Sequence, residues 1–436
     1  MEHQNWLNIC NRIPMIGDMI FKSVDEESLE TLRIANRDID TFISDARFFW
    51  LRKMGRYSNN FQEFQDAWNK TIKRTSTFIL MDLAQAIDEF FKGGPKKCPN
   101  VSSKRLQHQW SPLHIASAAG NLELCQHIAG QVRSKIPVGQ NGLTPMHLAA
   151  QQGHLEIVNF LNENWYEKNP GDERGDTPLH RAARHGHFEA FKLIFGAVDE
   201  KNPGNKSGDT PLHVAARYGS NSICQLILDD VSNKNPGNRL GLTPLHIAAT
   251  HGLLNVVDTI IQRIEEKNPL CDSGETPLHF AALGGHFLTS KLIIENIIDK
   301  NPVCHDGATP LHFSAMEGHA KVTNLLMKNV ENKHPRMTNG KTPLYLATES
   351  GHLDVYKVLL DNDHDKNPAH NSKGFTPLHV AAMKGHLDVV QFIVENVVDR
   401  NPADENGKTP FHCATENGHL EVVRFFLNHI KSKCMV

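Results

Sequence analysis

The sequence predicts an all-α fold: a solenoid of helix-turn-helix units with short hairpin fingers, preceded by a small helical N-terminal domain. Three observations predict it. A four-residue motif recurs ten times, Pro and Gly stand at fixed places in nearly every unit, and apolar residues follow the motif at helical spacing. Because one such unit cannot bury its apolar faces alone, neighbouring units should stack and share a core.

Composition excludes several functional classes. The 436 residues include 46 Lys and Arg against 49 Asp and Glu, a net charge of −3, so we expect no nucleic-acid partner. No stretch reaches the roughly 18 uninterrupted apolar residues of a membrane-spanning helix, so we expect no membrane insertion. The chain begins without a secretory leader and its 8 cysteines form no C-x-x-C pair. These features predict a cytoplasmic or nuclear protein without a disulfide framework.

The first 55 residues are predicted to form three short helices. Ile13 and Pro14 open the first helix, and Phe48, Trp50 and Leu51 belong to the third. The segment resembles an F-box, which implies that it binds a Skp-family adaptor of a cullin complex. The residues that would carry this contact are Pro14, Ile16, Ile20, Phe21, Leu29 and Leu32. The alternative is a generic helical cap on the solenoid.

Residues 56–106 are predicted to connect this segment to the repeats. Two amphipathic helices are expected between Phe61 and Phe91, because apolar side chains recur there at helical spacing. The Gly, Pro and Lys residues between Gly93 and Pro99 indicate a short linker.

Residues 107–436 contain ten repeats. The motif Thr-Pro-Leu-His, or a close variant, begins at Ser111, Thr144, Thr177, Thr210, Thr243, Thr276, Thr309, Thr342, Thr376 and Thr409. Successive copies are 33 residues apart, except for one interval of 34. The period and the pattern Thr-Pro-Leu-His-x-Ala-Ala-x-x-Gly-His resemble the ankyrin repeat.

Each unit has local signals for two helices. Thr210 suits the N-cap of the first helix, Pro211 its first position, and Gly219 the left-handed residue after its end. A second helix is expected from about Ser222 to Asp230. Lys-Asn-Pro or a variant then recurs in register, as at residues 234–236, and we expect it to end the second helix, with Lys in its last turn. The residues up to the next motif should form the projecting finger.

The 26 histidines invite a metal-site hypothesis, which the repeat pattern argues against. Sixteen of them occupy two fixed places, the fourth position of the motif and the position after the glycine that ends the first helix. Equivalent histidines would be about one helix spacing apart, too far to share an ion. We considered Cys271, Cys304, His305 and His370, at neighbouring fingertips, and set a metal there aside. We therefore expect no metal, no cofactor and no catalytic residue.

The resemblance implies that protein partners bind on the concave side, formed by the fingers and the first helices. The candidate binding residues there are Arg181, Arg184, His185, Arg217, Tyr218, His251, Leu283 and Met316. Arg bonds two carboxylate oxygens at once, so we expect a segment that presents acidic groups to the arginines and apolar groups to Leu283 and Met316. The alternative is a solvated surface whose composition drifts between repeats. The extra residue of the 34-residue interval falls between Pro368 and Gly374, as a specificity feature or a harmless insertion.

Together the two resemblances imply a substrate-recognition subunit of an SCF-type, cullin-RING ubiquitin ligase. The F-box-like segment would bind the adaptor while the repeats bind the substrate, and the chain itself would not be an enzyme. The alternative is an ankyrin scaffold or anchoring protein, including a host-targeting effector, with no ligase role.

Overall fold

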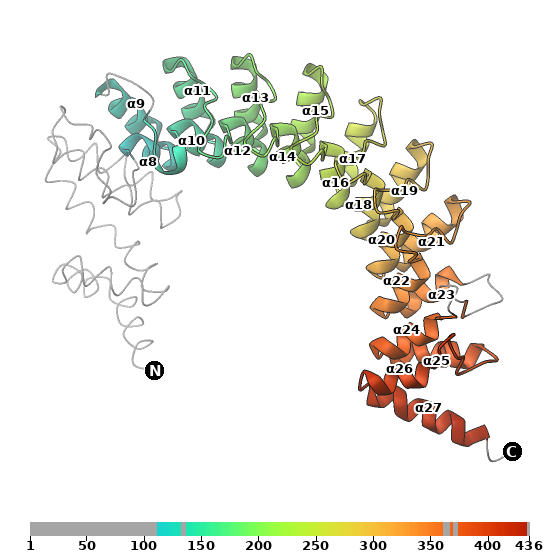
Figure 1. The fold of residues 1–436 in the computed structure, drawn as a ribbon. Helices are drawn as coiled ribbons and strands as arrows, with labels where there is room; N and C mark the ends of the chain where they lie inside the picture. The colour runs from blue at the N-terminus through green and yellow to red at the C-terminus, as the bar shows by residue number, and fades with distance from the viewer. Residues whose placement is uncertain (1–110, 132–136, 361–366, 369–373, 434–436) are drawn as a thin grey trace, which may run out of the picture. The chain divides into compact units, whose positions relative to one another are not determined.

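The computed structural model describes residues 111–131, 137–360, 367–368 and 374–433 (Figure 1). The F-box-like segment and the connector therefore lie outside the described residues. The chain divides into two units, Met1–Ser207 and Gly208–Val436, and each is considered by itself.

The described residues form paired α-helices, one short 3-10 helix at Gln140–Gly142 and no strand, which confirms the all-helical repeat fold. The first helices of the pairs are α8 (Pro112–Ala119), α10 (Pro145–Gln152), α12 (Pro178–His185), α14 (Pro211–Tyr218), α16 (Pro244–Thr250), α18 (Pro277–Leu283), α20 (Pro310–Met316), α22 (Pro343–Ser350), α24 (Pro377–Lys384) and α26 (Pro410–Glu416). The second helices are α9 (Leu122–Gln131), α11 (Leu155–Asn164), α13 (Phe188–Ala197), α15 (Asn221–Asp230), α17 (Leu254–Ile261), α19 (Phe287–Asn296), α21 (Ala320–Asn329), α23 (Leu353–Leu359), α25 (Leu387–Asn396) and α27 (Leu420–Lys433).

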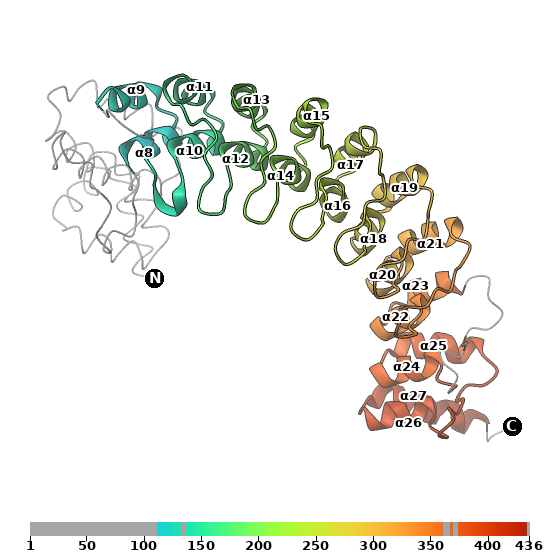
Figure 2. The same cartoon turned by 45° about the horizontal axis from the view of Figure 1, so that its top comes forward.

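Each unit consists of two rows of helices. In the first unit α8, α10 and α12 form one row and α9, α11 and α13 the other; in the second unit α14 to α26 and α15 to α27 alternate in the same way (Figures 1 and 2). The core lies between the rows. Leu179 and Ile194 are fully buried in the first unit, and Leu212 and Ile227 in the second. Each such side chain contributes about 1.5 to 3 kcal/mol by leaving water.

The first helices begin and end as their sequence predicts. Before α14, the hydroxyl of Thr210 accepts the backbone N–H of His213, and the His213 ring accepts the backbone N–H of Thr210. Pro211 occupies the first position, where no N–H is needed, and Gly219 follows the helix with φ +76°. The same reciprocal cap precedes nine of the ten described first helices, the exception being α22.

The expected end of the second helix at Asp230 is confirmed, but the role expected for Lys-Asn-Pro is wrong. Helix α15 ends at Asp230, before Lys234-Asn235-Pro236, so the lysine does not lie in its last turn. In the preceding repeat, Lys201 reaches back from beyond α13, and its Nζ donates to the Phe195 carbonyl at 2.7 Å. The asparagine instead serves the helix that follows. The Oδ1 of Asn235 accepts the backbone N–H of Leu245, at the start of α16, at 3.4 Å.

The fingers are tight turns, as expected. In the finger before α18, the N–H of Cys271 donates to the carbonyl of Glu275, and Gly274 adopts φ +83°. Neighbouring fingers of a unit are joined through their backbones. The N–H of Asp272 donates to the carbonyl of Leu240 on the preceding finger at 3.0 Å.

Among the residues that the structure describes, none of the helices combines the length and the apolar composition needed to cross a bilayer.

Candidate functional site

The motif histidines join consecutive repeats within each unit. Nδ1 of His147 accepts the backbone N–H of Thr144 at 3.0 Å, so in a neutral ring Nε2 carries the proton. That Nε2 donates to the Asp176 carbonyl, 29 residues later, at 2.9 Å. His279 makes the same pair of bonds in the second unit, to Thr276 and to the carbonyl of Ala308.

Burial keeps these rings neutral. It lowers the pKa of His147 and of His279 from 6.5 to about 4, and the bonds that their Nε2 atoms donate to carbonyls only partly oppose this effect. Protonation would also place a hydrogen on Nδ1, the atom that accepts the threonine N–H. The motif histidines are therefore unsuited to proton transfer near neutral pH.

The histidines after the terminating glycines form a second set of inter-repeat bonds. Nε2 of His286 bonds the Thr250 carbonyl, 36 residues earlier, at 2.9 Å, and His319 bonds the Leu283 carbonyl in the same way. These bonds secure the ends of the first helices. Both sets of histidines thus have structural partners in the backbone of a neighbouring repeat.

The fingertip residues considered as metal ligands form no metal site in the part of the chain that the structure describes. No group of three or more His, Cys, Asp or Glu side chains in the described residues could hold a metal ion. The Cys271 thiol donates to Glu275, and the Cys304 thiol donates to Asp306. Burial, followed by the Asp306 carboxylate, raises the pKa of Cys304 to about 11. His370 lies outside the described residues, and the absence of a cofactor stays a prediction.

The surface made by the fingers and the exposed sides of the first helices is called the finger face below. In the first unit it carries three predicted binding residues on α12: Arg181, Arg184 and His185. Arg181 is already paired, with its Nη2 2.6 Å from Oδ2 of Asp172. Burial alone would raise the pKa of Asp172, but the hydrogen bond from Arg181 helps to hold it below its usual value.

The remaining arginines are also paired within the chain. Arg184 lies 3.8 Å from Asp176 in the first unit, and Arg217 lies 3.3 Å from Asp209 in the second. About one third of each arginine side chain remains exposed. An acidic partner would therefore have to share or displace an internal carboxylate.

The other predicted residues of the second unit line the same face. Tyr218 at the end of α14 is 52% exposed. His251 caps the end of α16, and much of its side chain is exposed. The burial of the rest of the ring lowers the pKa of His251, and the nearby Arg217 charge lowers it further. Leu283 and Met316 end α18 and α20 and are half-buried. The structure thus brings Arg217, Tyr218, His251, Leu283 and Met316 onto the finger face of one unit.

A charge pattern on this face escaped the sequence reasoning. The residue before the capping threonine forms an ion pair with the helix residue eight positions later. Along the second unit, the order of the two charges changes from acidic-then-basic to basic-then-acidic. Asp209 pairs with Arg217, whereas Lys341 pairs with Glu349 at 2.7 Å and Lys408 with Glu416 at 2.6 Å. The pattern could have been predicted from the sequence, because a charged residue just before the capping threonine is followed eight residues later by a residue of opposite charge in the helix.

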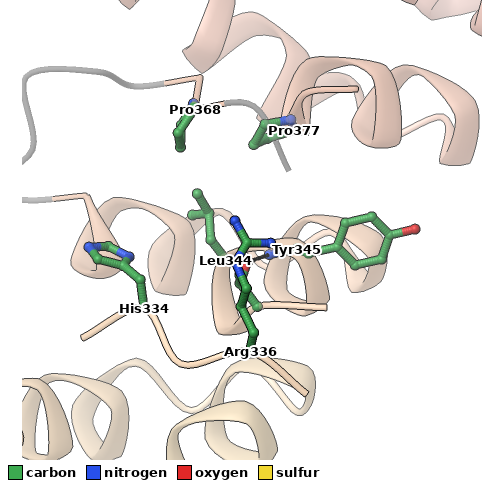
Figure 3. Close-up of a pocket in the computed structure, with 7 residues that line it drawn as sticks. His334, Arg336, Leu344, Tyr345, Pro368 and Pro377 are labelled. Carbon is green, nitrogen blue, oxygen red and sulfur yellow. Dashed lines mark hydrogen bonds between the residues drawn. The ribbon is translucent and has the colours of Figure 1, made fainter. Parts of the chain in front are cut away.

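One junction of the second unit departs from the repeat pattern in two described residues. His334 replaces the asparagine of Lys-Asn-Pro, and Tyr345 replaces the motif histidine. The cap of α22 is reduced accordingly to a bond from the Tyr345 N–H to Oγ1 of Thr342, at 3.2 Å. A hollow of about 100 Å³ lies here, lined by His334, Arg336, Thr342, Leu344, Tyr345, Pro368 and Pro377. Figure 3 shows the Tyr345 ring directed away from the other labelled residues.

A protein-family model matches most of the chain. The family model described as "Ankyrin repeats (3 copies)" matches overlapping segments of the chain, at residues 85–172, 113–202, 161–236, 195–272, 229–304, 261–336, 289–370 and 362–435. No curated protein matches the sequence.

Proposed function

The chain belongs to the ankyrin-repeat family, and we propose from this that it is a protein-interaction protein whose finger face binds a segment of a partner. The observation that carries the proposal is the placement of Tyr218, Leu283 and Met316. All three are large side chains at the ends of first helices, and they keep surface exposed where packing between repeats does not need them. Tyr is among the residues that most often carry the binding energy of a protein interface, and surrounding side chains contribute by excluding water.

We propose that the arginines of the finger face, Arg181 and Arg184 in the first unit and Arg217 in the second, each receive acidic groups of a partner. The internal aspartates weaken this attraction but do not cancel it, because Arg184 and Arg217 keep part of their guanidinium groups exposed. His185 follows Arg184 at the end of α12. His251 follows α16, which is the next first helix after α14, where Arg217 lies. Their lowered pKa values favour neutral rings that can accept as well as donate hydrogen bonds.

Charge reversal tests this part of the proposal. Arg184→Glu with Arg217→Glu should weaken partner capture by the full chain, and unchanged capture would contradict it. The matched control exchanges both members of a pair, Asp209→Arg with Arg217→Glu. This control restores an internal ion pair, so a loss of binding without a loss of thermal stability assigns the effect to the surface charge.

For the whole chain, we propose a substrate-recognition subunit of an SCF-type, cullin-RING ubiquitin ligase. The support is the F-box resemblance of residues 1–55, in which Pro14, Ile16, Ile20, Phe21, Leu29 and Leu32 would bind the Skp-family adaptor. The repeats would then present the bound substrate to the ligase, and the chain would supply no catalytic group.

Co-purification with a Skp-type adaptor tests the ligase proposal. The intact chain should retain the adaptor, and the chain lacking residues 1–55 should not. If neither retains it, the ligase role is excluded, and a scaffold or anchoring function of the repeats takes its place.

A further inference from the structure

The middle of the finger face in the second unit differs from its two ends in charge. At the ends, the pairs Asp209–Arg217, Lys341–Glu349 and Lys408–Glu416 neutralise the surface. At the equivalent positions of the α18 and α20 repeats stand Glu275 with Leu283, and Ala308 with Met316. Within residues 268–286 and 301–319, all of which the structure describes, no side chain forms an ion pair.

The unbalanced charge in this stretch is negative. Residues 268–290 and 301–320 contain no Lys or Arg, whereas Asp272, Asp306 and Glu317 are exposed and Glu275 is half-exposed. The thiols of Cys271 and Cys304 donate to Glu275 and Asp306, but a thiol brings no charge to balance the carboxylates. The fingers before and after these two carry Arg239 and Arg336.

The same two repeats concentrate exposed apolar side chains. Half-buried Leu283 and Met316 stand where the repeats of the charge pairs carry Arg217, Glu349 and Glu416. On the fingers, Leu270 is 62% exposed and Val303 is 60% exposed, where the three preceding fingers carry glycine. The two repeats are neighbours, since α18 packs on α20 and the N–H of His305 donates to the Ser273 carbonyl at 3.1 Å. These six residues of the two neighbouring repeats, Leu270, Glu275, Leu283, Val303, Asp306 and Met316, are called the acidic-apolar patch below.

We propose that this patch binds a protein segment in which Lys or Arg alternates with apolar side chains. The inference rests on the proposed protein-binding function and names the chemistry of the bound segment. Apolar side chains of the segment would cover Leu283, Met316 and the finger residues, while its cations would pair with carboxylates that have no internal counter-charge. Such complementarity sets specificity and association rate, and it weakens as salt screens it.

A single substitution should give the patch an internal counter-charge and so remove its attraction for a cationic segment. Leu283→Arg places a guanidinium eight residues after Glu275, which reproduces the spacing of the observed Asp209–Arg217 pair. Leu288→Arg is the matched control, because Leu288 is 60% exposed on α19, outside the finger face, and the net charge changes equally. Glu275→Gln with Asp306→Asn removes the negative charge while keeping the acceptor atoms for the two thiols.

The probes are labelled twelve-residue peptides of repeating Arg-Leu-Ser, Glu-Leu-Ser or Arg-Ser-Ser, titrated into the full chain. We expect Arg-Leu-Ser to bind most tightly and to weaken as NaCl rises from about 50 to about 300 mM. Leu283→Arg and the double variant should each weaken its binding by about tenfold or more, and Leu288→Arg by less than about twofold. Thermal melts of each variant show whether the chain remains folded.

Two results would overturn the inference. One is equal binding of Arg-Leu-Ser by the Leu283→Arg and Leu288→Arg chains, and the other is absent or weaker binding of Arg-Leu-Ser than of Glu-Leu-Ser. Tighter binding of Glu-Leu-Ser would leave the protein-binding function in place while refuting the cationic segment. Failure of the proposed finger-face binding itself would appear separately, as unchanged partner capture by the Arg184→Glu, Arg217→Glu chain described above.

Discussion

Single histidine side chains connect the local and long-range structure of this protein. Each motif histidine caps its own helix through Nδ1, and seven of the nine bond the next finger of the same unit through Nε2, as His147 and His279 do. These roles require a neutral ring. Residue-scale chemistry therefore links the stability of the array to pH.

Stability should fall as the solution is acidified from about pH 6.5 to about pH 4. Burial lowers the pKa of the folded-state ring from 6.5 to about 4 at His114, His147, His246, His279 and His312. Between these values the unfolded chain binds more protons than the folded chain, so the free energy of unfolding decreases with falling pH. Each ring contributes up to about 1.4 kcal/mol per pH unit.

Urea unfolding of His279→Gln at about pH 7, 6 and 5 checks this effect. The variant should be less stable than the parent at neutral pH, and its stability should depend less steeply on pH. His305→Gln, at an exposed fingertip, is the control that should retain the parental slope. An unaltered slope in His279→Gln would contradict the account.

The same chemistry predicts a stabilising substitution at the junction shown in Figure 3. Tyr345→His should allow Nδ1 to accept the Thr342 N–H and Nε2 to donate toward the carbonyl of Phe375, which precedes the next capping threonine. A gain of about 0.5 to 1.5 kcal/mol is expected for each added hydrogen bond. Thermal unfolding measures this gain, with Tyr345→Phe as the control. A destabilised Tyr345→His chain would show that the added histidine bonds do not form at this junction.

At the scale of the helices, the terminating glycines predict a graded response. An alanine at Gly219 would have to adopt φ +76°, but its Cβ would meet only Leu253 at 3.4 Å. At Gly351, with φ +79°, the Cβ would lie 2.5 Å from the His386 ring, whose Nε2 bonds the Glu349 carbonyl. Gly219→Ala should lose about 1 to 2 kcal/mol from backbone strain alone, and Gly351→Ala should lose more. Chemical unfolding compares the two, and equal losses would refute the role of the histidine bond.

The helices also show which features local sequence can predict. Thr-Pro and Gly locate both ends of α14 because capping, ring closure and left-handed φ act within one turn. The lysine of Lys-Asn-Pro was wrongly placed in the last turn of the second helix, because long-range packing ends that helix before it. Ile297 follows α19 in an extended conformation and is only 5% exposed, so the chain leaves the helix in order to bury it.

The candidate surface was predicted less completely than the fold. The repeat period predicts where the surface lies. It does not reveal the aspartates of the same chain that pair with Arg181, Arg184 and Arg217. Their aspartates lie on the finger or just before the helix, at separations of eight or nine residues that match no helical contact. Only the folded finger brings those carboxylates beside the helix, and this changes which charges remain available to a partner.

At the scale of the whole molecule, repetition separates stability from recognition. Residues at the repeated positions, such as Thr, Pro, His and Gly, hold neighbouring repeats together. Positions that vary between repeats, such as Arg217, Leu283 and Glu349, determine the charge and polarity of the finger face. We therefore expect a partner to distinguish this protein from other arrays through the variable positions.

The most direct test of this central claim is site-specific photo-crosslinking in cells that express the full chain. A benzophenone amino acid at Leu283, on the finger face, is compared with the same group at Leu288, on α19. The account predicts discrete crosslinked partner bands from position 283 and only background from position 288. Equal crosslinking at both positions, or crosslinking from position 288 alone, would show that the finger face is not the binding surface.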